Sequence, residues 1–312
     1  MKSNNKKNES IVILAPNNIL DIYVEALKFS FGVEDIILVS DSESNDYRIN
    51  IINEINDNKK VKKVIFFDYC YTFHQLIQKI SNNKDKYIII KNAVAEMTSS
   101  YIYDYIKYYF EYLDRGLVNK IAFLDPNFYL ENNKKLVNLT LDVPKQIEKN
   151  KENSNFGVIS YDFYEYHNFF NQICAIKKIT NDSINIFNPC NITKEFCQDF
   201  DIKYKEFDTI EEIINNSKCL LYVNFCYDDN LYLLKCIDNK KVCVMGNFDF
   251  GEDFKYLNDT LVIKSDDDIN EISNKLLNSY ENREDLLNSL VDYRKMVSSL
   301  SKDQIANFLN EE

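Results

Sequence analysis

Residues that can take part in acid–base chemistry stand where predicted strands of the first half of the chain end. Asp68 directly follows an apolar run, and His74 lies on the helical segment after it. Either side chain could act as a general base for a hydroxyl group. For His74 the alternative is a polar tip on a helix beside Phe73. Asn17 and Asn18 end the first strand of the same half and are further candidates for ligand contact.

A candidate anion site opens the predicted helix 165–178 of the second half. His167 and Asn168 stand at its start, where backbone N–H groups and the helix dipole favour an anion. The alternative is a half-exposed histidine that packs among neighbouring aromatic residues. The chain has only 5 glycines, which argues against a glycine-rich phosphate loop. A bound phosphate would therefore depend on such a helix N-terminus.

The segment Tyr227-Asp228-Asp229-Asn230 follows a buried strand and precedes a helix. Its carboxylates can accept hydrogen bonds from the hydroxyl groups of a ligand, whereas Asp229 or Asn230 alone could equally cap the helix. The 8 cysteines and 2 histidines show no zinc-binding spacing, and one adjacent Asp-Asp pair is a weak metal motif. We therefore expect no metal and no cofactor.

Charge and composition exclude several classes of protein. The net charge is −12, so no general attraction to nucleic acid or to an anionic membrane is expected. Hydrophobic residues make up 45% of the chain, which argues against disorder. The first apolar run, 11–15, stops at Pro16 and is too short for a signal peptide or a membrane span. We expect a cytoplasmic protein with no nucleic-acid partner and no transmembrane segment.

Short β-branched runs alternate with segments of helical period along the whole chain, which predicts βα units on parallel sheets. Strands are expected at 11–15, 35–40, 63–68, 87–91, 120–125, 157–161, 183–187, 203–207, 219–224, 242–246 and 260–264. Helices are expected at 19–30, 73–81, 100–115, 165–178, 192–200, 209–217, 230–240 and 267–279, with two more over 282–310 and a break near Ser298–Ser301. The aromatic run 101–112 could be a binding surface, but its helical spacing favours a place in the core.

A length of 312 residues favours two domains. We expect a disordered tail over 1–10, an α/β domain over 11–145, a linker within 142–155, a second α/β domain over 155–300 and a helical tail over 301–312. Parallel sheets of this kind bind ligands at the carboxyl ends of their strands. The expected site is therefore a cleft between two Rossmann-like domains that face each other.

The second half resembles the carboxyl domain of GT-B glycosyltransferases of the group 1 kind, also called family 4. The segment Ile202–Phe225 looks like the strand, nucleobase loop, short helix and buried strand of that family. The segment Asn230–Gly246 matches the next helix and strand in length and apolar pattern. The likeness covers about 155–300, while the first half resembles the family only in its βα pattern.

The resemblance implies a nucleotide-sugar donor and a set of donor-binding positions. Glu206, Phe207 and Asp208 stand where the base-binding loop would be, although Phe207 could instead belong to the core. The other implied donor-side residues are Ser160, His167, Asn168, Tyr227, Asp228, Asp229, Asn230 and Lys235. On the acceptor side, Asn17 and Asn18 are joined by Lys91, at a strand end where related enzymes often carry a histidine.

Two positions depart from the family pattern. Retaining members carry an acidic pair spaced Glu-x7-Glu, whose second carboxylate meets the ribose of the donor. That second position is Lys235 here, and the first is Tyr227. A lysine donates hydrogen bonds where an acceptor is expected, so either the donor is held differently or the site has decayed. The Arg/Lys pair that neutralises the donor diphosphate is also missing, which leaves His167.

Together these features predict a glycosyltransferase that moves a sugar from a nucleotide-sugar to a glycan or protein acceptor, with Asp68 or His74 as the catalytic base. The alternative is a non-catalytic GT-B-like protein that acts as a partner or scaffold of an active transferase. Lys235 and the missing basic pair favour this alternative. The sequence leaves open the donor sugar, the acceptor, the stereochemistry and the oligomeric state.

Overall fold

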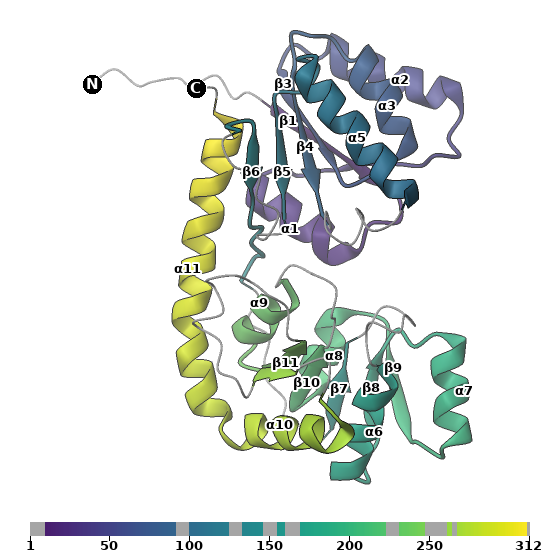
Figure 1. Cartoon of the computed structure of the whole chain (residues 1–312), viewed down its shortest axis with the longest axis vertical. Helices are drawn as coiled ribbons and strands as arrows, with labels where there is room; N and C mark the ends of the chain where they lie inside the picture. The colour runs from purple at the N-terminus through teal and green to yellow at the C-terminus, as the bar shows by residue number, and fades with distance from the viewer. Residues whose placement is uncertain are drawn as a thin grey trace. The chain divides into compact units, whose positions relative to one another are not determined.

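The computed structural model describes residues 10–91, 100–124, 133–145, 155–159, 169–222, 231–246, 261–263 and 267–310 (Figure 1). The chain divides into two compact units. The first comprises Met1–Pro144 with Leu300–Glu312, and the second comprises Lys145–Ser299. The predicted disordered tail lies outside the described residues apart from Ser10, which begins the first strand.

Each unit contains a six-stranded sheet in which all strand pairs are parallel, which confirms the predicted α/β class with two Rossmann-like domains. The first sheet has the order β2-β1-β3-β4-β5-β6. Its strands are β1 Ser10–Pro16, β2 Ile37–Val39, β3 Val61–Phe67, β4 Asp85–Ile90, β5 Lys120–Phe123 and β6 Leu136–Asn138. The first five were predicted, whereas β6 was missed because its three half-buried residues form no recognisable apolar run.

Helices cover both faces of the first sheet. They are α1 Asp21–Phe31, α2 Asn45–Asp57, α3 Tyr71–Lys79 and α5 Ser100–Asp114. Side chains alternate between the faces of a strand, so Phe66 of β3 packs in the core under α2, α3 and α5, whereas Phe67 meets Tyr23 of α1 at 5.6 Å between ring centroids (Figure 1). Because both faces are buried, the central strands end in continuous apolar runs, at 64–67 in β3 and 87–90 in β4.

Helix α2 was not predicted, and its composition explains why. It buries only Ile51, Ile52 and Ile55 in a segment otherwise rich in Asn and Asp, so its apolar stripe is narrow. The usable signal lies at its start, where the side chain of Ser44 accepts a hydrogen bond from the backbone N–H of Tyr47.

The second sheet has the order β12-β11-β10-β7-β8-β9. Its strands are β7 Phe156–Val158, β8 Ile184–Phe187, β9 Tyr204–Phe207, β10 Cys219–Tyr222, β11 Val242–Gly246 and β12 Val262–Ile263. Its helices are α6 Phe169–Ile179, α7 Asn191–Asp199, α8 Ile210–Asn216, α9 Leu231–Asp238 and α10 Ile269–Glu281. Each of these elements falls within or beside a predicted range.

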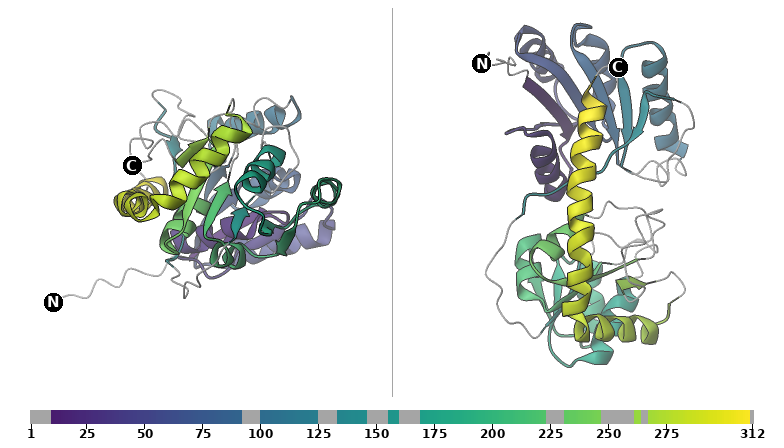
Figure 2. Two further views of the ribbon diagram at one scale, coloured as in Figure 1. Left: turned by 90° about the horizontal axis from the view of Figure 1, so that it is seen from below. Right: turned by 90° about the vertical axis from the view of Figure 1, so that its left-hand side faces the viewer.

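The end of the chain differs from the prediction. Instead of two helices with a break near Ser298–Ser301, a single helix α11 runs over Arg283–Leu309, as the right view of Figure 2 shows. The serines do not end the helix because packing accommodates them: the Ser298 hydroxyl accepts a hydrogen bond from Arg294 at 2.6 Å, and Ser301 is buried. Residues up to Ser299 belong to the second unit and those from Leu300 to the first.

The carboxyl end of α11 is held by lysines of the first sheet. Lys120 Nζ donates to the carbonyls of Asn307 and Asn310 at 2.8 and 2.7 Å, and Lys63 donates to the carbonyl of Leu309. Cations at this end satisfy carbonyls that have no partner within the helix and complement its dipole. The last turn of α11 is therefore part of the first unit.

In the second unit, α11 is anchored by a buried ion pair. Arg294 Nε and Nη2 both lie 2.9 Å from carboxylate oxygens of Asp238 on α9, and the two side chains are 4% and 7% exposed. Two parallel hydrogen bonds between a guanidinium and a carboxylate give this contact a defined geometry. Removing one partner would leave the other charge buried and unpaired.

We predict that Arg294→Met lowers the free energy of unfolding of the second unit by about 3–5 kcal/mol, because Asp238 then stays buried without its partner. Urea unfolding followed by circular dichroism measures this loss. The control is Lys295→Met in the next position, whose ion pair with Asp292 is exposed and should contribute less than about 1 kcal/mol. Equal losses in the two variants would contradict the prediction.

Candidate functional site

The carboxyl edge of the first sheet collects most of the candidate residues of that unit. Because the strands are parallel, the residues that follow them meet at the same edge. Asn17 and Asn18 form an exposed turn after β1, Asp68 follows β3 and Lys91 follows β4. The backbone N–H of Asp68 donates to the carbonyl of Ile89 at 2.7 Å, which ties the ends of β3 and β4 together.

Asp68 has an unusual backbone conformation. Its φ of 61° lies in the left-handed region, which is uncommon for residues other than glycine but which Asp and Asn tolerate best. Its carbonyl accepts a hydrogen bond from the hydroxyl of Tyr109 on α5 at 3.3 Å. The left-handed turn ends β3 sharply and leads into α3. Such conformations are often found at functional sites.

Lys91 lies on the α1 side of the same edge. Its Nζ is 4.2 Å from the ring centroid of Tyr23, a distance typical of a cation–π contact. The same ring packs on Phe67, the last residue of β3. Lys91 therefore brings a positive charge to the end of β4, next to the strand that Asp68 follows.

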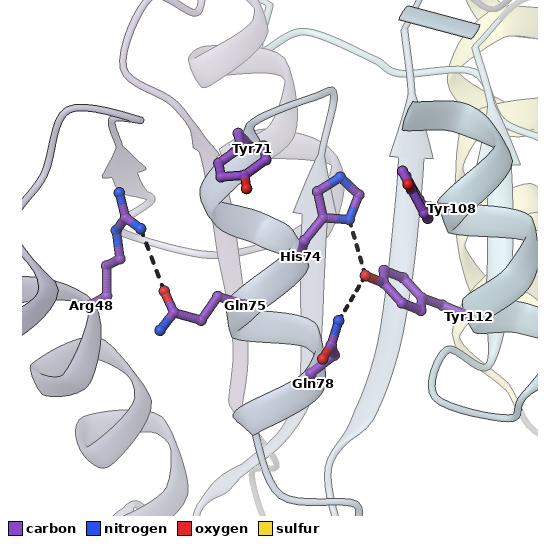
Figure 3. Close-up of a pocket in the computed structure, with 7 residues that line it drawn as sticks. All are labelled: Arg48, Tyr71, His74, Gln75, Gln78, Tyr108 and Tyr112. Atoms are coloured by element: carbon purple, nitrogen blue, oxygen red, sulfur yellow. Dashed lines mark hydrogen bonds between the residues drawn. The ribbon is translucent and has the colours of Figure 1, made fainter. Parts of the chain in front are cut away.

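His74 lies on α3 among five tyrosines. The ring centroids of Tyr69, Tyr71, Tyr108, Tyr109 and Tyr112 are 5.3 to 6.1 Å from that of the imidazole. The Nδ1 atom is 3.1 Å from the hydroxyl of Tyr112, which also accepts a hydrogen bond from Gln78 Nε2 at 2.9 Å (Figure 3). The histidine is thus a member of a side-chain network between α3 and α5.

Around this network α2, α3 and α5 form a pocket of about 460 Å³ (Figure 3). It is lined by Arg48, Tyr71, His74, Gln75, Gln78, Tyr108 and Tyr112. The guanidinium of Arg48 donates to the carbonyl of Asp41 at 2.9 Å and to Gln75 Oε1 at 3.4 Å. The volume of the pocket lies within the range of about 300–1,000 Å³ that is usual for small-ligand sites.

Of these lining residues, His74 was predicted as a site residue. The aromatic run 101–112, which includes Tyr108 and Tyr112, was expected in the core, with a binding surface as the alternative. Tyr109 and Tyr112 are buried as expected, whereas Tyr108 is 46% exposed and lines the pocket. The expectation of a core position rested on the helical spacing of the aromatic residues alone. That spacing does not show which face of α5 is covered by a neighbouring helix and which face stays exposed.

Asp41 anchors the start of α3 next to this pocket. Its Oδ1 accepts a hydrogen bond from the backbone N–H of Thr72 at 2.9 Å and lies 3.0 Å from Cys70 Sγ. Burial, together with the carboxylate of Asp41, raises the pKa of the Cys70 thiol to about 12. Cys70 is therefore a protonated packing residue at neutral pH and not a nucleophile.

Burial acts in the opposite direction on His74, where it lowers the pKa of the imidazole, and the charge of Asp41 offsets this only in part. The ring is therefore neutral at pH 7. A neutral imidazole can accept a proton, which is the state that a general base needs.

We predict that His74 titrates below the usual histidine pKa of about 6.5. The chain has 2 histidines, so proton NMR of the imidazole region should show two signals, which His167→Asn assigns. Because the unfolded chain would bind this proton more readily than the folded one, the stability of the first unit should fall as the pH drops below about 6.5. A midpoint of 6.5 or higher for the His74 signal would overturn this assignment.

In the second unit, the predicted base-binding residues stand at the end of β9. Glu206 and Asp208 are exposed, and Phe207 is half-buried, so its ring is not enclosed in the core. Glu206 Oε2 lies 2.8 Å from Lys194 Nζ of α7. The carbonyl of Phe207 accepts a hydrogen bond from the backbone N–H of Asn188 at 2.8 Å. Their contact with a nucleobase stays a prediction.

Lys235, at the position of the expected ribose-binding carboxylate, is 5% exposed on α9 and pairs with Glu211 of α8 at 2.5 Å. The other donor-side candidates lie outside the described residues. They are Ser160, His167, Asn168, Tyr227, Asp228, Asp229 and Asn230.

In the described ranges, no group of three or more His, Cys, Asp or Glu side chains is placed to hold a metal ion. No helix in these ranges combines the length and the apolar character needed to cross a membrane.

Comparison with known proteins identifies the fold but no sequence family. No family model and no curated protein matches the chain. Among solved structures, a glycosyltransferase from Rickettsia africae matches with a TM-score of 0.59 and 12% identity over 96% of each chain. HepE from Anabaena, in complex with UDP, matches with a TM-score of 0.66 and 7% identity over 96% of this chain and 99% of that one.

A third solved structure is a TarM variant from S. aureus in complex with fondaparinux, alpha-GlcNAc-glycerol and UDP. It matches with a TM-score of 0.61 and 15% identity over 84% of this chain and 58% of that one. The chain thus spans a little over half the length of TarM. At these identities the likeness shows the fold, and it confirms the GT-B fold that the sequence resemblance implied.

Proposed function

We propose that this protein is a glycosyltransferase that transfers a sugar from a nucleotide-sugar donor to a glycan or protein acceptor. The observation that carries the proposal is a likeness along almost the whole chain: both parallel sheets are matched by HepE, whose structure contains UDP. A glycosyltransferase from Rickettsia africae matches over an equal share of the chain. The same fold can serve other functions, so the activity needs its own test.

The proposed acceptor side is the carboxyl edge of the first sheet. Asn17 and Asn18 would bind acceptor hydroxyls there, and Lys91 would contribute its positive charge. Asp68 would accept the proton of the acceptor hydroxyl as its oxygen attacks the anomeric carbon and the bond to the nucleoside diphosphate breaks. His74 is a neutral base nearby on α3, and its catalytic role stays a prediction.

The proposed donor side is the carboxyl edge of the second sheet. Glu206, Phe207 and Asp208 would contact the nucleobase, and the residues after β7 and β10 would bind the diphosphate and the sugar. These latter residues are Ser160, His167, Asn168, Tyr227, Asp228, Asp229 and Asn230. Lys235 is already paired with Glu211, so it would reach a donor only by giving up that part-buried contact. The absence of a metal or cofactor remains an expectation.

Calorimetry with UDP, GDP and their hexose derivatives tests the donor. We expect binding of one nucleoside diphosphate at micromolar to millimolar concentration, with weaker binding of the matching nucleoside. If none of these compounds binds at millimolar concentration, the proposal is wrong. If a donor binds but the protein neither transfers nor hydrolyses its sugar, the proposed activity is wrong while the donor site remains.

Asp68→Asn tests the base. Asn tolerates the left-handed backbone but cannot accept the proton, so transfer should fall by about 10²–10⁴-fold while nucleotide affinity is unchanged. Asp201 of the second unit has a φ of 49° and lies in an exposed turn, whereas Asp68 is half-buried, so Asp201→Asn controls for the same exchange in a left-handed backbone conformation. Full transfer activity in Asp68→Asn would exclude Asp68 as the base.

A further inference from the structure

The pocket between α3 and α5 is not explained by the proposed transfer reaction. Of its seven lining residues, only His74 is a candidate for that reaction, and all seven lie on helices α2, α3 and α5. We infer that this pocket binds a neutral oligosaccharide through stacking on its tyrosine rings and hydrogen bonds to its amide and hydroxyl groups. The inference goes beyond the proposed function because it requires neither a donor nor a transfer step.

Two exposed aromatic rings form the walls of the pocket. Tyr71, on the first turn of α3, is 58% exposed, and Tyr108 on α5 is 46% exposed (Figure 3). Tyr109 and Tyr112 are buried near His74, whereas Tyr71 and Tyr108 leave large ring surfaces in contact with water. The C–H groups of a pyranose ring form an apolar face that can pack on such a ring, while the ring hydroxyls point sideways to polar neighbours.

The polar side chains of the pocket suit hydroxyl groups. Gln75 and Gln78 each offer an amide that can donate and accept. Both line the cavity, and Gln78 is already oriented by its hydrogen bond to the hydroxyl of the buried Tyr112. A sugar hydroxyl is likewise both donor and acceptor, so it can be satisfied at any of these groups without a formal charge.

The charge of the pocket favours a neutral ligand over an anionic one. None of the seven lining residues carries a carboxylate, and Arg48 is the only residue among them that is always charged. Its guanidinium is engaged by the carbonyl of Asp41 and by Gln75, and the imidazole of His74 is neutral at pH 7. The whole chain carries a net charge of −12, which opposes the approach of polyanions.

The experiment is a binding screen of the full chain against neutral oligosaccharides of hexoses and N-acetylhexosamines, with sulfated oligosaccharides alongside. Saturation-transfer NMR identifies a binder, and calorimetry measures its dissociation constant. We expect a neutral oligosaccharide to bind, and Tyr71→Ala and Tyr108→Ala each to weaken it by about tenfold or more. Tyr71→Phe should keep most of the affinity because the ring remains.

The matched control is Phe200→Ala, which removes another exposed aromatic ring, 63% exposed, from the second unit and should leave binding unchanged. The inference is overturned if no neutral oligosaccharide binds at millimolar concentration, if only sulfated ones bind, or if folded Tyr71→Ala and Tyr108→Ala proteins bind as well as the parent. Calorimetry with UDP, GDP and their hexose derivatives on the same samples separates the two proposals. If an oligosaccharide binds and none of these nucleotides does, only the nucleotide-sugar donor is contradicted. If a nucleotide binds and no neutral oligosaccharide does, only the pocket inference is contradicted.

Discussion

Parallel strand pairing is the constraint on which the rest of this structure depends. A parallel sheet needs a crossover after each strand, so helices cover both faces and the strands become continuous apolar runs. The same pairing brings the residues after neighbouring strands to a common edge. In the first unit this edge brings together Asn17, Asn18, Asp68 and Lys91, which are up to 74 positions apart in the printed sequence. The polar chemistry of the unit is therefore concentrated where the apolar runs end.

A second concentration of polar side chains arises on the helices and not at the strand ends. Helices α3 and α5 follow neighbouring strands β3 and β4, so they lie next to each other on one face of the sheet (Figure 1). Their facing surfaces carry His74, Gln78, Tyr108 and Tyr112, which form a network beside an open pocket. Burial of His74 lowers the pKa of its imidazole and keeps the ring neutral at pH 7, so the network is suited to hydrogen bonding more than to holding a charge.

Sequence reasoning was most successful where one physical signal dominated. The buried strands were found because covering both faces leaves only apolar residues in them, and the division into two α/β units followed from repeating that pattern over a long chain. It failed where the signal was weak or depended on a partner. Helix α2 buries too narrow a stripe, β6 is too short, and the serines of α11 looked like a break because their partner Arg294 and their burial were not visible in the sequence.

The sequence by itself determined the fold class, the two sheets and the residue types at the strand ends, because hydrophobicity and helical or strand period are local properties of the chain. Only the tertiary structure decided which side chains lie next to one another and which stay exposed. It placed Lys235 against Glu211, engaged Glu206 with Lys194, ended β3 with Asp68 in a left-handed turn and left Tyr108 exposed beside His74. These outcomes depend on distances between residues remote in sequence, and no local pattern encodes such distances.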